Sequence, residues 1–424
     1  MNQPLSRYVD YMYSYPHKTA YRPFPAPVSL LPYLEQLQGR KASLYFHIPF
    51  CSHKCGYCNL FSLQTNRTEY IATYLDTLHR QAQQLSPLTA GLTFDSVAIG
   101  GGTPLLLTVP QLEQLMATAA LFGVHPSHAF TSVETSPEYA DRPRLNVLKK
   151  AGVSRVSIGI QSFQDEELKA IKRRPRQNTI YQALDDIRQM DFPYFNIDLI
   201  YGIKGQTVES FLYSLEEALR FQPNELFIYP LYVRQGTGIT EREPDDVCFR
   251  MYRAACKLLQ AKGFLQTSMR RFIHHPSTDA EVSCGDEVML SCGSGGRSYL
   301  GDLHYATRYT VCQQCIAREI DEYMATTDFT VARNGFILSA KEQQQRFIIK
   351  NLMYYMGIDK AEYTRRFGEP LDRTPLFRQL AEQYWIEETP ERIRLTPEGL
   401  GYSDYIGQLF ITPEIRQLME TYSY

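Results

Sequence analysis

From residue 43 to about residue 235, short strand-like segments alternate with longer helix-like segments. Apolar and β-branched residues predict six strands, at residues 43–48, 94–99, 129–134, 155–160, 195–200 and 225–229. Helical patterns lie between these strands at about 68–85, 109–122, 179–190 and 208–221, and one more ends near Lys150. This alternation predicts a parallel sheet covered by helices. Six units are too few for a closed eight-stranded barrel, so we expect an α/β fold with a partial (β/α)6 barrel.

The segments before and after this region have their own predicted elements. A helix is expected at about 243–263, whereas residues 266–325 look irregular. Helical patterns at 341–356, 360–367 and 375–383, a hairpin at 386–395 and a final helix predict a mainly helical, winged-helix-like C-terminal domain. We therefore expect an N-terminal arm (1–42), the barrel (43–240), a connecting substrate-side region (241–325) and the C-terminal domain (326–424). The tyrosine-rich arm could cover a substrate pocket or pack on the domain surface.

Composition narrows the class of protein. Hydrophobic residues make up 44% of the 424 residues and charged residues 21%, which is ordinary for a globular protein with a sizeable core. A net charge of −2 gives no reason to expect a nucleic-acid partner. No stretch approaches the length of a membrane span, and no signal peptide is evident. Nine cysteines without an export signal favour a reducing compartment, so we expect a cytoplasmic enzyme.

Three cysteines follow the first predicted strand in a C-x3-C-x2-C pattern: Cys51, Cys55 and Cys58. A [4Fe–4S] cluster normally takes four cysteines, so three would leave one iron open to a substrate or cofactor. The alternatives are a zinc site or three structural thiols. Zinc sites usually pair one C-x2-C with a second pair of ligands downstream, which favours the cluster.

Further polar and glycine-rich segments fall at the ends of the predicted strands. Gly100, Gly101 and Gly102 precede Thr103 and allow a tight turn whose N–H groups could meet an anion. Other strands end at Glu134, at Gln161 and Ser162, and at Asp198, while Arg173 lies just beyond the fourth strand. Because parallel strands place these ends on one rim, we expect a ligand there with complementary polar groups.

In this order, these motifs resemble the radical S-adenosylmethionine (SAM) superfamily. Within it, the chain resembles the oxygen-independent coproporphyrinogen III oxidases and their relatives in haem trafficking and haem utilisation. The residues that carry the resemblance are the cysteine loop, the glycine turn, Glu134-Thr135-Ser136-Pro137, Ser157-Ile158-Gly159-Ile160-Gln161-Ser162-Phe163 and Asn196-Ile197-Asp198-Leu199-Ile200-Tyr201-Gly202. The resemblance is strongest over residues 43–240 and looser in the C-terminal domain.

The resemblance implies cofactors and a role for each residue. Cys51, Cys55 and Cys58 would hold a [4Fe–4S] cluster whose open iron binds SAM. The residues that would contact SAM are Gly101, Gly102, Thr103, Glu134, Gln161, Arg173 and Asp198. Tyr45 matches the tyrosine six residues before the first cysteine and is the candidate catalytic residue. An electron donor such as flavodoxin or ferredoxin would reduce the cluster, and the resulting 5′-deoxyadenosyl radical would act on a tetrapyrrole-like small molecule.

Two departures from the family pattern bear on the substrate. Leu60 stands where coproporphyrinogen oxidases carry an extra cysteine, and Lys172-Arg173-Arg174-Pro175 lacks the histidine of their Gly-Arg-x-His motif. Both argue against porphyrinogen decarboxylation. They favour the haem-utilisation group, whose members modify or open the porphyrin ring, with or without methyl transfer. The alternatives are a coproporphyrinogen dehydrogenase and a haem-delivery protein that keeps the cluster without turnover.

Other residues could add ligands. Cys284, Cys292, Cys312 and Cys315 could bind zinc or a second cluster, although Cys292 to Ser298 more readily forms a tight glycine-rich loop facing the active site. The candidate haem ligands are His17, His47, His53, His274, His275 and His304.

Overall fold

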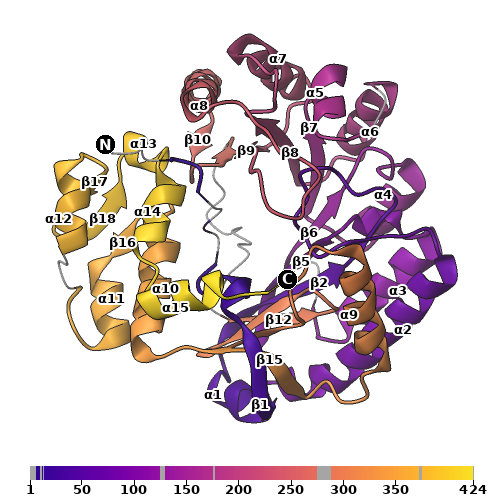
Figure 1. Cartoon of the computed structure of the whole chain (residues 1–424). Helices are drawn as coiled ribbons and strands as arrows, with labels where there is room; N and C mark the ends of the chain where they lie inside the picture. The colour runs from indigo at the N-terminus through magenta and orange to yellow at the C-terminus, as the bar shows by residue number, and fades with distance from the viewer. Residues whose placement is uncertain are drawn as a thin grey trace.

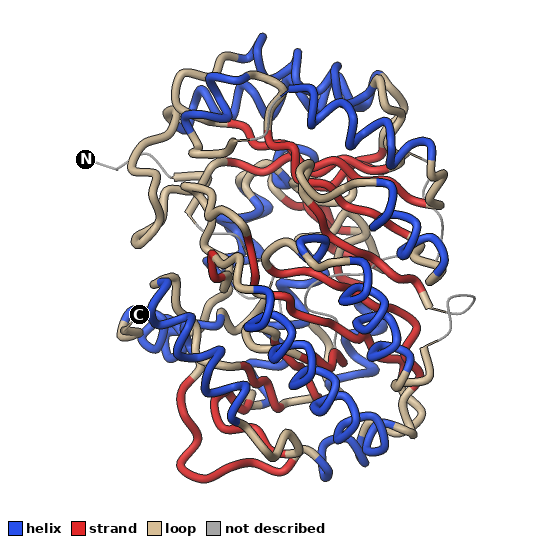
Figure 2. The backbone as a smooth tube through the Cα atoms, turned by 90° about the vertical axis from the view of Figure 1, so that its right-hand side faces the viewer, coloured by secondary structure: helices blue, strands red, loops and turns tan. Residues whose placement is uncertain are grey.

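The computed structural model describes residues 6–9, 12, 14–124, 129–174, 177–274, 288–371 and 375–423. Its main feature is one open 13-stranded sheet, with helices on the outside (Figures 1 and 2). Six parallel neighbours form its centre, in chain order: β2 (Lys41–Ile48), β5 (Thr93–Gly101), β6 (Phe130–Thr135), β7 (Arg155–Gln161), β8 (Tyr194–Tyr201) and β9 (Glu225–Pro230). The predicted partial barrel is confirmed.

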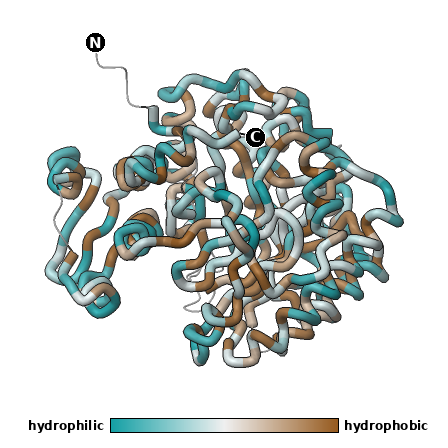
Figure 3. The backbone as a smooth tube through the Cα atoms, turned by 60° about the horizontal axis from the view of Figure 1, so that its bottom comes forward, coloured by the Kyte–Doolittle hydropathy of each residue, from teal (hydrophilic) through white to brown (hydrophobic). Residues whose placement is uncertain are grey.

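Helices connect these strands on the outer face. They are α2 (Thr68–Leu85), α3 (Val109–Ala120), α4 (Arg142–Lys150), α5 (Asp165–Ala170), α6 (Gln177–Gln189) and α7 (Val208–Leu219), and α8 (Asp245–Ala261) follows β9. Hydrophobic and hydrophilic residues alternate along the outer helices (Figure 3). In α2, Ile71, Leu75 and Leu78 recur at helical spacing and are buried against the sheet.

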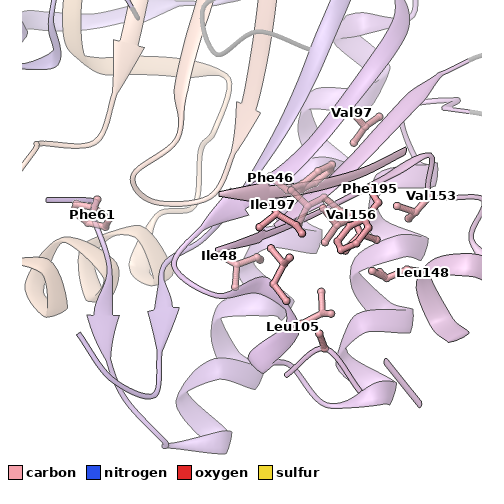
Figure 4. Packing of buried hydrophobic residues seen from close by; sticks show 14 of the residues in the cluster. Phe46, Ile48, Phe61, Val97, Leu105, Leu148, Val153, Val156, Phe195 and Ile197 are labelled. Atoms are coloured by element: carbon pink, nitrogen blue, oxygen red, sulfur yellow. The ribbon is translucent and has the colours of Figure 1, made fainter. Parts of the chain in front are cut away.

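The side chains of β2 point alternately to the hydrophobic core and to the interior of the barrel. Leu44, Phe46 and Ile48 are fully buried and belong to the main hydrophobic core. Figure 4 shows Phe46 and Ile48 of β2 together with Val156 of β7 and Ile197 of β8, which belong to the same core. Because successive side chains of a strand point to opposite faces, the intervening Tyr45 and His47 face the inside of the barrel.

The described parts of the segment 266–325, residues 266–274 and 288–325, contain regular strands and a helix, contrary to the expectation from the sequence. β12 (Val288–Cys292) pairs in parallel with β2 and extends the barrel, and it is followed by antiparallel β13 (Arg297–Leu300), β14 (Leu303–Ala306) and helix α9 (Gln313–Ala325). β15 (Val331–Ile337) and β1 (Arg22–Ser29) complete this side of the sheet. These strands are short, and β12 and β1 take their places by pairing with the distant β2 and β15, so local periodicity gives little sign of them.

The other edge of the sheet ends in two short antiparallel strands. β11 (Arg271–Ile273) pairs with β9, and β10 (Leu265–Gln266) pairs with β11. No helix among the described residues is long and apolar enough to cross a membrane.

The C-terminal domain has a second hydrophobic core, and it lies at the open side of the sheet (Figure 1). Its elements follow the order of a winged helix: α10 (Ala340–Leu352), β16 (Ile358–Asp359), α11 (Lys360–Phe367), α12 (Pro375–Glu382), β17 (Ile386–Glu388) and β18 (Arg392–Leu395). The expected single final helix is instead three short helices, α13 (Pro397–Leu400), α14 (Ser403–Leu409) and α15 (Pro413–Glu420). Pro397 and Pro413 each begin a new helix, because proline fits a first turn but not a helix interior.

The N-terminal arm packs into the protein rather than onto its surface. Tyr8 belongs to the main core and Tyr15 to the C-terminal core, so the arm joins the two. Tyr11 and Tyr13 lie outside the described residues. His17 and Lys18 reach the cavity described below, which means that the arm both packs inside and borders the pocket.

Candidate active site

A cavity of about 470 Å³ opens at the carboxyl ends of the parallel strands. This is the end at which α/β barrels place their chemistry. All eleven residues selected from the sequence lie in its wall: Tyr45, Cys51, Cys55, Cys58, Gly101, Gly102, Thr103, Glu134, Gln161, Arg173 and Asp198. The structure therefore brings them together, while their roles as ligands remain predictions.

The cysteine loop is held by segments far from it in sequence. The Thr103 hydroxyl donates to Cys51 Sγ at 3.6 Å, and Arg173 Nη1 donates to Cys55 Sγ at 3.3 Å. Gly56 donates its N–H to the Ile171 carbonyl at 2.9 Å, and a Cβ at this position would lie only 2.8 Å from Ile239 Cδ1. The position of the cysteine loop therefore depends on the hydrogen bonds from Thr103 and Arg173 and on Gly56, whose missing side chain allows close packing.

The surroundings of the cysteine loop change the acidity of its thiols. Burial raises the pKa of Cys51 to about 11 and also raises the pKa of Cys58. Metal coordination deprotonates such thiols outright, and soft thiolates suit iron–sulfur clusters. No fourth cysteine lines this cavity among the described residues. The donor set fits a cluster with one iron left open by the protein.

The glycine turn fits against the cysteine loop, and this corrects the expected reason for the glycines. The N–H groups of Gly101, Gly102 and Thr103 donate to Glu134 Oε2, the Ile48 carbonyl and the Phe50 carbonyl, at 3.1, 2.8 and 2.8 Å. They are therefore not available as an anion cradle. A Cβ on Gly102 would lie 2.5 Å from the Phe50 carbonyl oxygen, so close approach to the loop explains the missing side chain.

Two carboxyl groups lie in the cavity wall. Desolvation by the surrounding cavity wall raises the pKa of Glu134, although its side chain is exposed to the cavity and the N–H of Gly101 partly opposes the shift. Burial also raises the pKa of Asp198 to about 7, against the lowering effect of Asn196, whose Nδ2 donates to Asp198 Oδ1 at 2.7 Å. Carboxyl groups with raised pKa values in a cleft are typical of functional sites.

Asp198 makes the stability of the protein depend on pH. Its pKa is higher in the folded protein than its usual 3.8, so between about pH 4 and pH 7 the folded state binds more protons than the unfolded state. Stability should therefore fall as pH rises through this window. We expect Asp198→Asn to remove about 2–4 kcal/mol of this decline. Urea unfolding at a series of pH values would measure it, with exposed Asp76→Asn as the control, and an unchanged slope in Asp198→Asn would contradict it.

The backbone of Gln161 and the side chain of Arg173 each have a feature that is typical of a ligand-binding site. Gln161 adopts a left-handed φ of 75° at the end of β7, a conformation that costs energy for a residue with a Cβ and clusters at binding sites. Arg173 Nε is buried without a hydrogen-bond partner, although the other guanidinium nitrogens bond Cys55 Sγ and the Gly159 carbonyl. A ligand carboxylate would satisfy that nitrogen.

Tyr45 is oriented by a buried histidine. His47 Nε2 lies 2.9 Å from the Phe61 carbonyl, and its Nδ1 lies 3.0 Å from the Tyr45 hydroxyl. Burial lowers the pKa of His47 to about 4, so its ring is neutral at pH 7. The neutral ring donates from Nε2 and accepts from the Tyr45 hydroxyl at Nδ1.

A further group of residues that line the cavity was largely missed by the sequence analysis. It consists of the basic residues Lys18, Arg234, Arg297 and Arg308 and the aromatic residues Tyr229, Tyr232 and Tyr309. Only Arg297 lay in a motif that had been singled out. The predicted glycine-rich loop facing the cavity is confirmed, since Gly295 and Arg297 both line it. Such basic residues look like ordinary surface charges in a sequence, because only folding brings them to one cavity.

Some other candidates lie elsewhere. Ser162 is fully buried and donates to Glu167 Oε2 at 2.6 Å, so it supports the sheet rather than the cavity. Among the histidines, His17, His47 and His53 line the cavity, whereas His274 and the fully buried His304 do not. His275 and Cys284 lie outside the described residues. Cys292 is fully buried, and neither it nor Cys312 and Cys315 line this cavity, so a second metal site at these cysteines stays a prediction.

One departure from the family pattern borders the cavity: Leu60 lines it and is 44% exposed. Arg174 also lines the cavity, whereas Pro175, which stands in place of the family's histidine, lies outside the described residues. An apolar side chain thus stands where an additional thiol would stand in a coproporphyrinogen oxidase.

An open parallel barrel with three loop thiols at its carboxyl end defines the chain as a radical SAM protein. The radical SAM superfamily model matches residues 45–218, and the HemN C-terminal domain model matches residues 338–401. The chain belongs to the family that comprises the oxygen-independent coproporphyrinogen III oxidases (HemN) and the heme chaperones HemW. Proteins of this superfamily use a [4Fe–4S] cluster and SAM, which are therefore the cofactors of this chain.

The similarity to individual relatives extends over most of the chain. The oxygen-independent coproporphyrinogen III oxidase of Salmonella typhimurium is 31% identical over 394 residues, covering 85% of this chain and 83% of the relative. The heme chaperone HemW of Bacillus subtilis is 27% identical over 386 residues, covering 87% of this chain and 100% of HemW. The solved structure of coproporphyrinogen III oxidase (HemN) from Escherichia coli superposes with a TM-score of 0.82 at 23% identity, covering 95% of this chain and 97% of that one. This superposition establishes the shared fold.

Proposed function

We propose that this chain is a radical SAM enzyme whose substrate is a tetrapyrrole with carboxylate side chains, such as haem. The observation that carries the proposal is the lining of the cavity, which combines thiols and carboxyl groups with basic side chains and aromatic rings. The whole chain has a net charge of −2, so the basic residues of this lining do not reflect a generally basic protein. Aromatic rings suit a flat macrocycle and arginines suit its carboxylates.

Two groups of cavity-lining residues hold the two cofactors. Cys51, Cys55 and Cys58 hold the cluster, while Glu134, Gln161, Arg173 and Asp198 hold SAM with the turn at Gly101, Gly102 and Thr103. When bound and reduced by a donor such as flavodoxin or ferredoxin, the cluster supplies one electron that splits SAM into methionine and a 5′-deoxyadenosyl radical. Tyr45, oriented by His47, borders the space left for the substrate.

Leu60 and the absence of a histidine near Arg174 favour ring modification or opening, with or without methyl transfer, over porphyrinogen decarboxylation. A second candidate function is haem delivery without turnover. The similarity to HemW along its whole length favours that candidate.

One experiment separates the two candidates. The protein is loaded anaerobically with iron and sulfide, then incubated with SAM, dithionite and haem. Release of 5′-deoxyadenosine together with loss of the haem absorption band is expected for the enzyme. Stoichiometric haem binding without SAM cleavage would identify a carrier instead.

Arg297 offers a direct test of carboxylate recognition. We expect Arg297→Gln to weaken haem binding about tenfold, because a hydrogen bond to a charged group contributes about 1.5–3 kcal/mol. Haem dimethyl ester, which lacks the carboxylates, should bind wild type and variant alike. Absorbance titration measures both ligands, and the exposed Arg333→Gln is the matched control. Equal weakening for haem and its ester would show that Arg297 supports the wall without binding a carboxylate.

A further inference from the structure

Asn196 of β8 is a buried polar residue to which the proposed function gives no role. It stands two positions before Asp198, so the two side chains lie on the same face of the strand, toward the interior of the barrel. Asn196 is 0% exposed and does not line the cavity, whereas Asp198 and Ser157 do. Ser157 is its direct neighbour in the parallel pairing of β7 and β8. Asn196 therefore lies directly behind two residues of the cavity lining.

The side-chain amide of Asn196 joins these two residues. Its Nδ2 donates to Ser157 Oγ and to Asp198 Oδ1, each at 2.7 Å. An ionised carboxylate only accepts hydrogen bonds, so the amide must turn its N–H groups and not its oxygen toward Asp198. The contact occupies Oδ1 and leaves the second carboxyl oxygen, to which no described residue donates, for a ligand in the cavity.

The oxygen of the same amide has no partner. Asn196 Oδ1 is buried and accepts no hydrogen bond from any residue that the structure describes. A buried unpaired oxygen opposes folding, and a leucine of similar size would avoid that cost. Exceptions of this kind are expected where a residue serves a functional site rather than the stability of the core. The amide of Asn196 therefore points to a role beyond packing.

The charged groups around Asp198 do not bond to it within the described part of the chain. Arg155 of β7 donates to Glu225 of β9 at 2.5 Å, so its charge is already paired. Burial, and to a lesser extent Glu134 of β6 and Glu225, raise the pKa of Asp198, whereas Asn196 lowers it more than Arg155 does. The amide is therefore the main group that favours the ionised carboxyl.

We propose that Asn196 is a positioning residue for SAM, which holds the Asp198 carboxyl in one orientation and leaves one of its oxygens to the N–H or O–H groups of the cofactor. This role rests on the proposed function, in which Asp198 holds SAM. Asn196 contacts the carboxyl and not the cavity, so it acts through Asp198. Without the amide the carboxyl should turn more freely, and its pKa should rise. A protonated carboxyl is the weaker acceptor, so SAM binding should weaken most near neutral pH.

The test measures the binding of SAM rather than its cleavage. Cluster-loaded protein without a reductant is dialysed anaerobically against radiolabelled SAM between about pH 6 and about pH 9. We expect Asn196→Leu to raise the dissociation constant about tenfold at pH 7, because a hydrogen bond to a charged group is lost. The difference from wild type should shrink toward the alkaline end, where the carboxyl is ionised in both proteins. Asn196→Ala, which adds no bulk, should show the same pH dependence and carries the test if Asn196→Leu folds poorly.

The matched control is Ser96→Ala, which removes a buried hydrogen bond elsewhere in the barrel interior. Ser96 Oγ lies 2.6 Å from Ser43 Oγ, and neither residue lines the cavity. This variant should bind SAM as wild type does. A double-mutant cycle isolates the contact: in an Asp198→Asn protein, adding Asn196→Leu should weaken SAM binding by less than about twofold. Fully additive effects would overturn the positioning role.

The single variants separate this role from the proposed function. If Asp198→Asn weakens SAM binding but Asn196→Leu and Asn196→Ala leave it unchanged, or weaken it equally at every pH, Asn196 is not a positioning residue. If folded Asp198→Asn and Asn196→Leu proteins both bind SAM as wild type does, Asp198 does not hold SAM, and the proposed function loses that contact. Circular dichroism checks the fold of each variant.

Discussion

Replacing Cys55 by alanine is expected to abolish SAM cleavage, to below about a thousandth of the wild-type rate. A cluster bound by three thiolates has no spare protein ligand, because no further cysteine lines the cavity among the described residues. The substitution also removes the sulfur that accepts the hydrogen bond of Arg173. Iron content, the brown colour of the cluster and 5′-deoxyadenosine release would all fall together.

The matched control is Cys256→Ala, which removes a half-buried thiol of α8 that does not line the cavity. This variant should keep its iron and its SAM cleavage. Circular dichroism would check that Cys55→Ala keeps the secondary structure of the wild type. Retained cleavage in a folded Cys55→Ala protein would refute the assignment of the cluster ligands.

Strong periodicity explains why the barrel could be predicted from the sequence. Helix α2 was predicted at its observed bounds, and the six central strands were each found within about two residues. Their patterns repeat over whole elements, so local sequence determines them. The topology then brings the strand ends to one rim, which explains why Glu134, Gln161 and Asp198 could be grouped before the structure was known.

The missed features depend on contacts between distant segments. β12 is five residues long and takes its place by pairing with β2, more than 200 residues earlier in the chain. Likewise, the N–H groups of the glycine turn appeared available in the sequence, but Ile48, Phe50 and Glu134 accept them in the fold. The division of the chain into four segments stays a prediction, and β15 of the proposed C-terminal segment pairs within the large sheet.

The C-terminal domain is joined to the cavity wall by a buried ion pair. Arg270, between β10 and β11, donates to both carboxylate oxygens of Asp404 on α14 at 2.6 Å. The side chains are 5% and 1% exposed. Tyr232, which lines the cavity, hydrogen-bonds both partners. The pair therefore connects the edge of the open sheet, the C-terminal domain and the lining of the cavity at one point.

Removing one partner should be costly, because it leaves the other charge buried and uncompensated. We expect Asp404→Ala to lower the free energy of unfolding by about 3–5 kcal/mol. Trp385 is the single tryptophan, and it is buried in the C-terminal core, so its fluorescence reports unfolding of that domain in urea. The exposed pair Arg365–Glu362 supplies the control, since Glu362→Ala should cost about 0.5 kcal/mol or less.

A second variant distinguishes a lost charge partner from lost packing. Arg270→Met combined with Asp404→Leu removes both charges at similar side-chain volume, and replacing a buried pair in this way is often nearly neutral. We therefore expect the double variant to recover most of the stability lost in Asp404→Ala. It should still bind haem more weakly than wild type, because Tyr232 loses both hydrogen-bond partners that hold it at the cavity wall. A double variant as unstable as Asp404→Ala would show that shape, and not charge compensation, determines the cost at this contact.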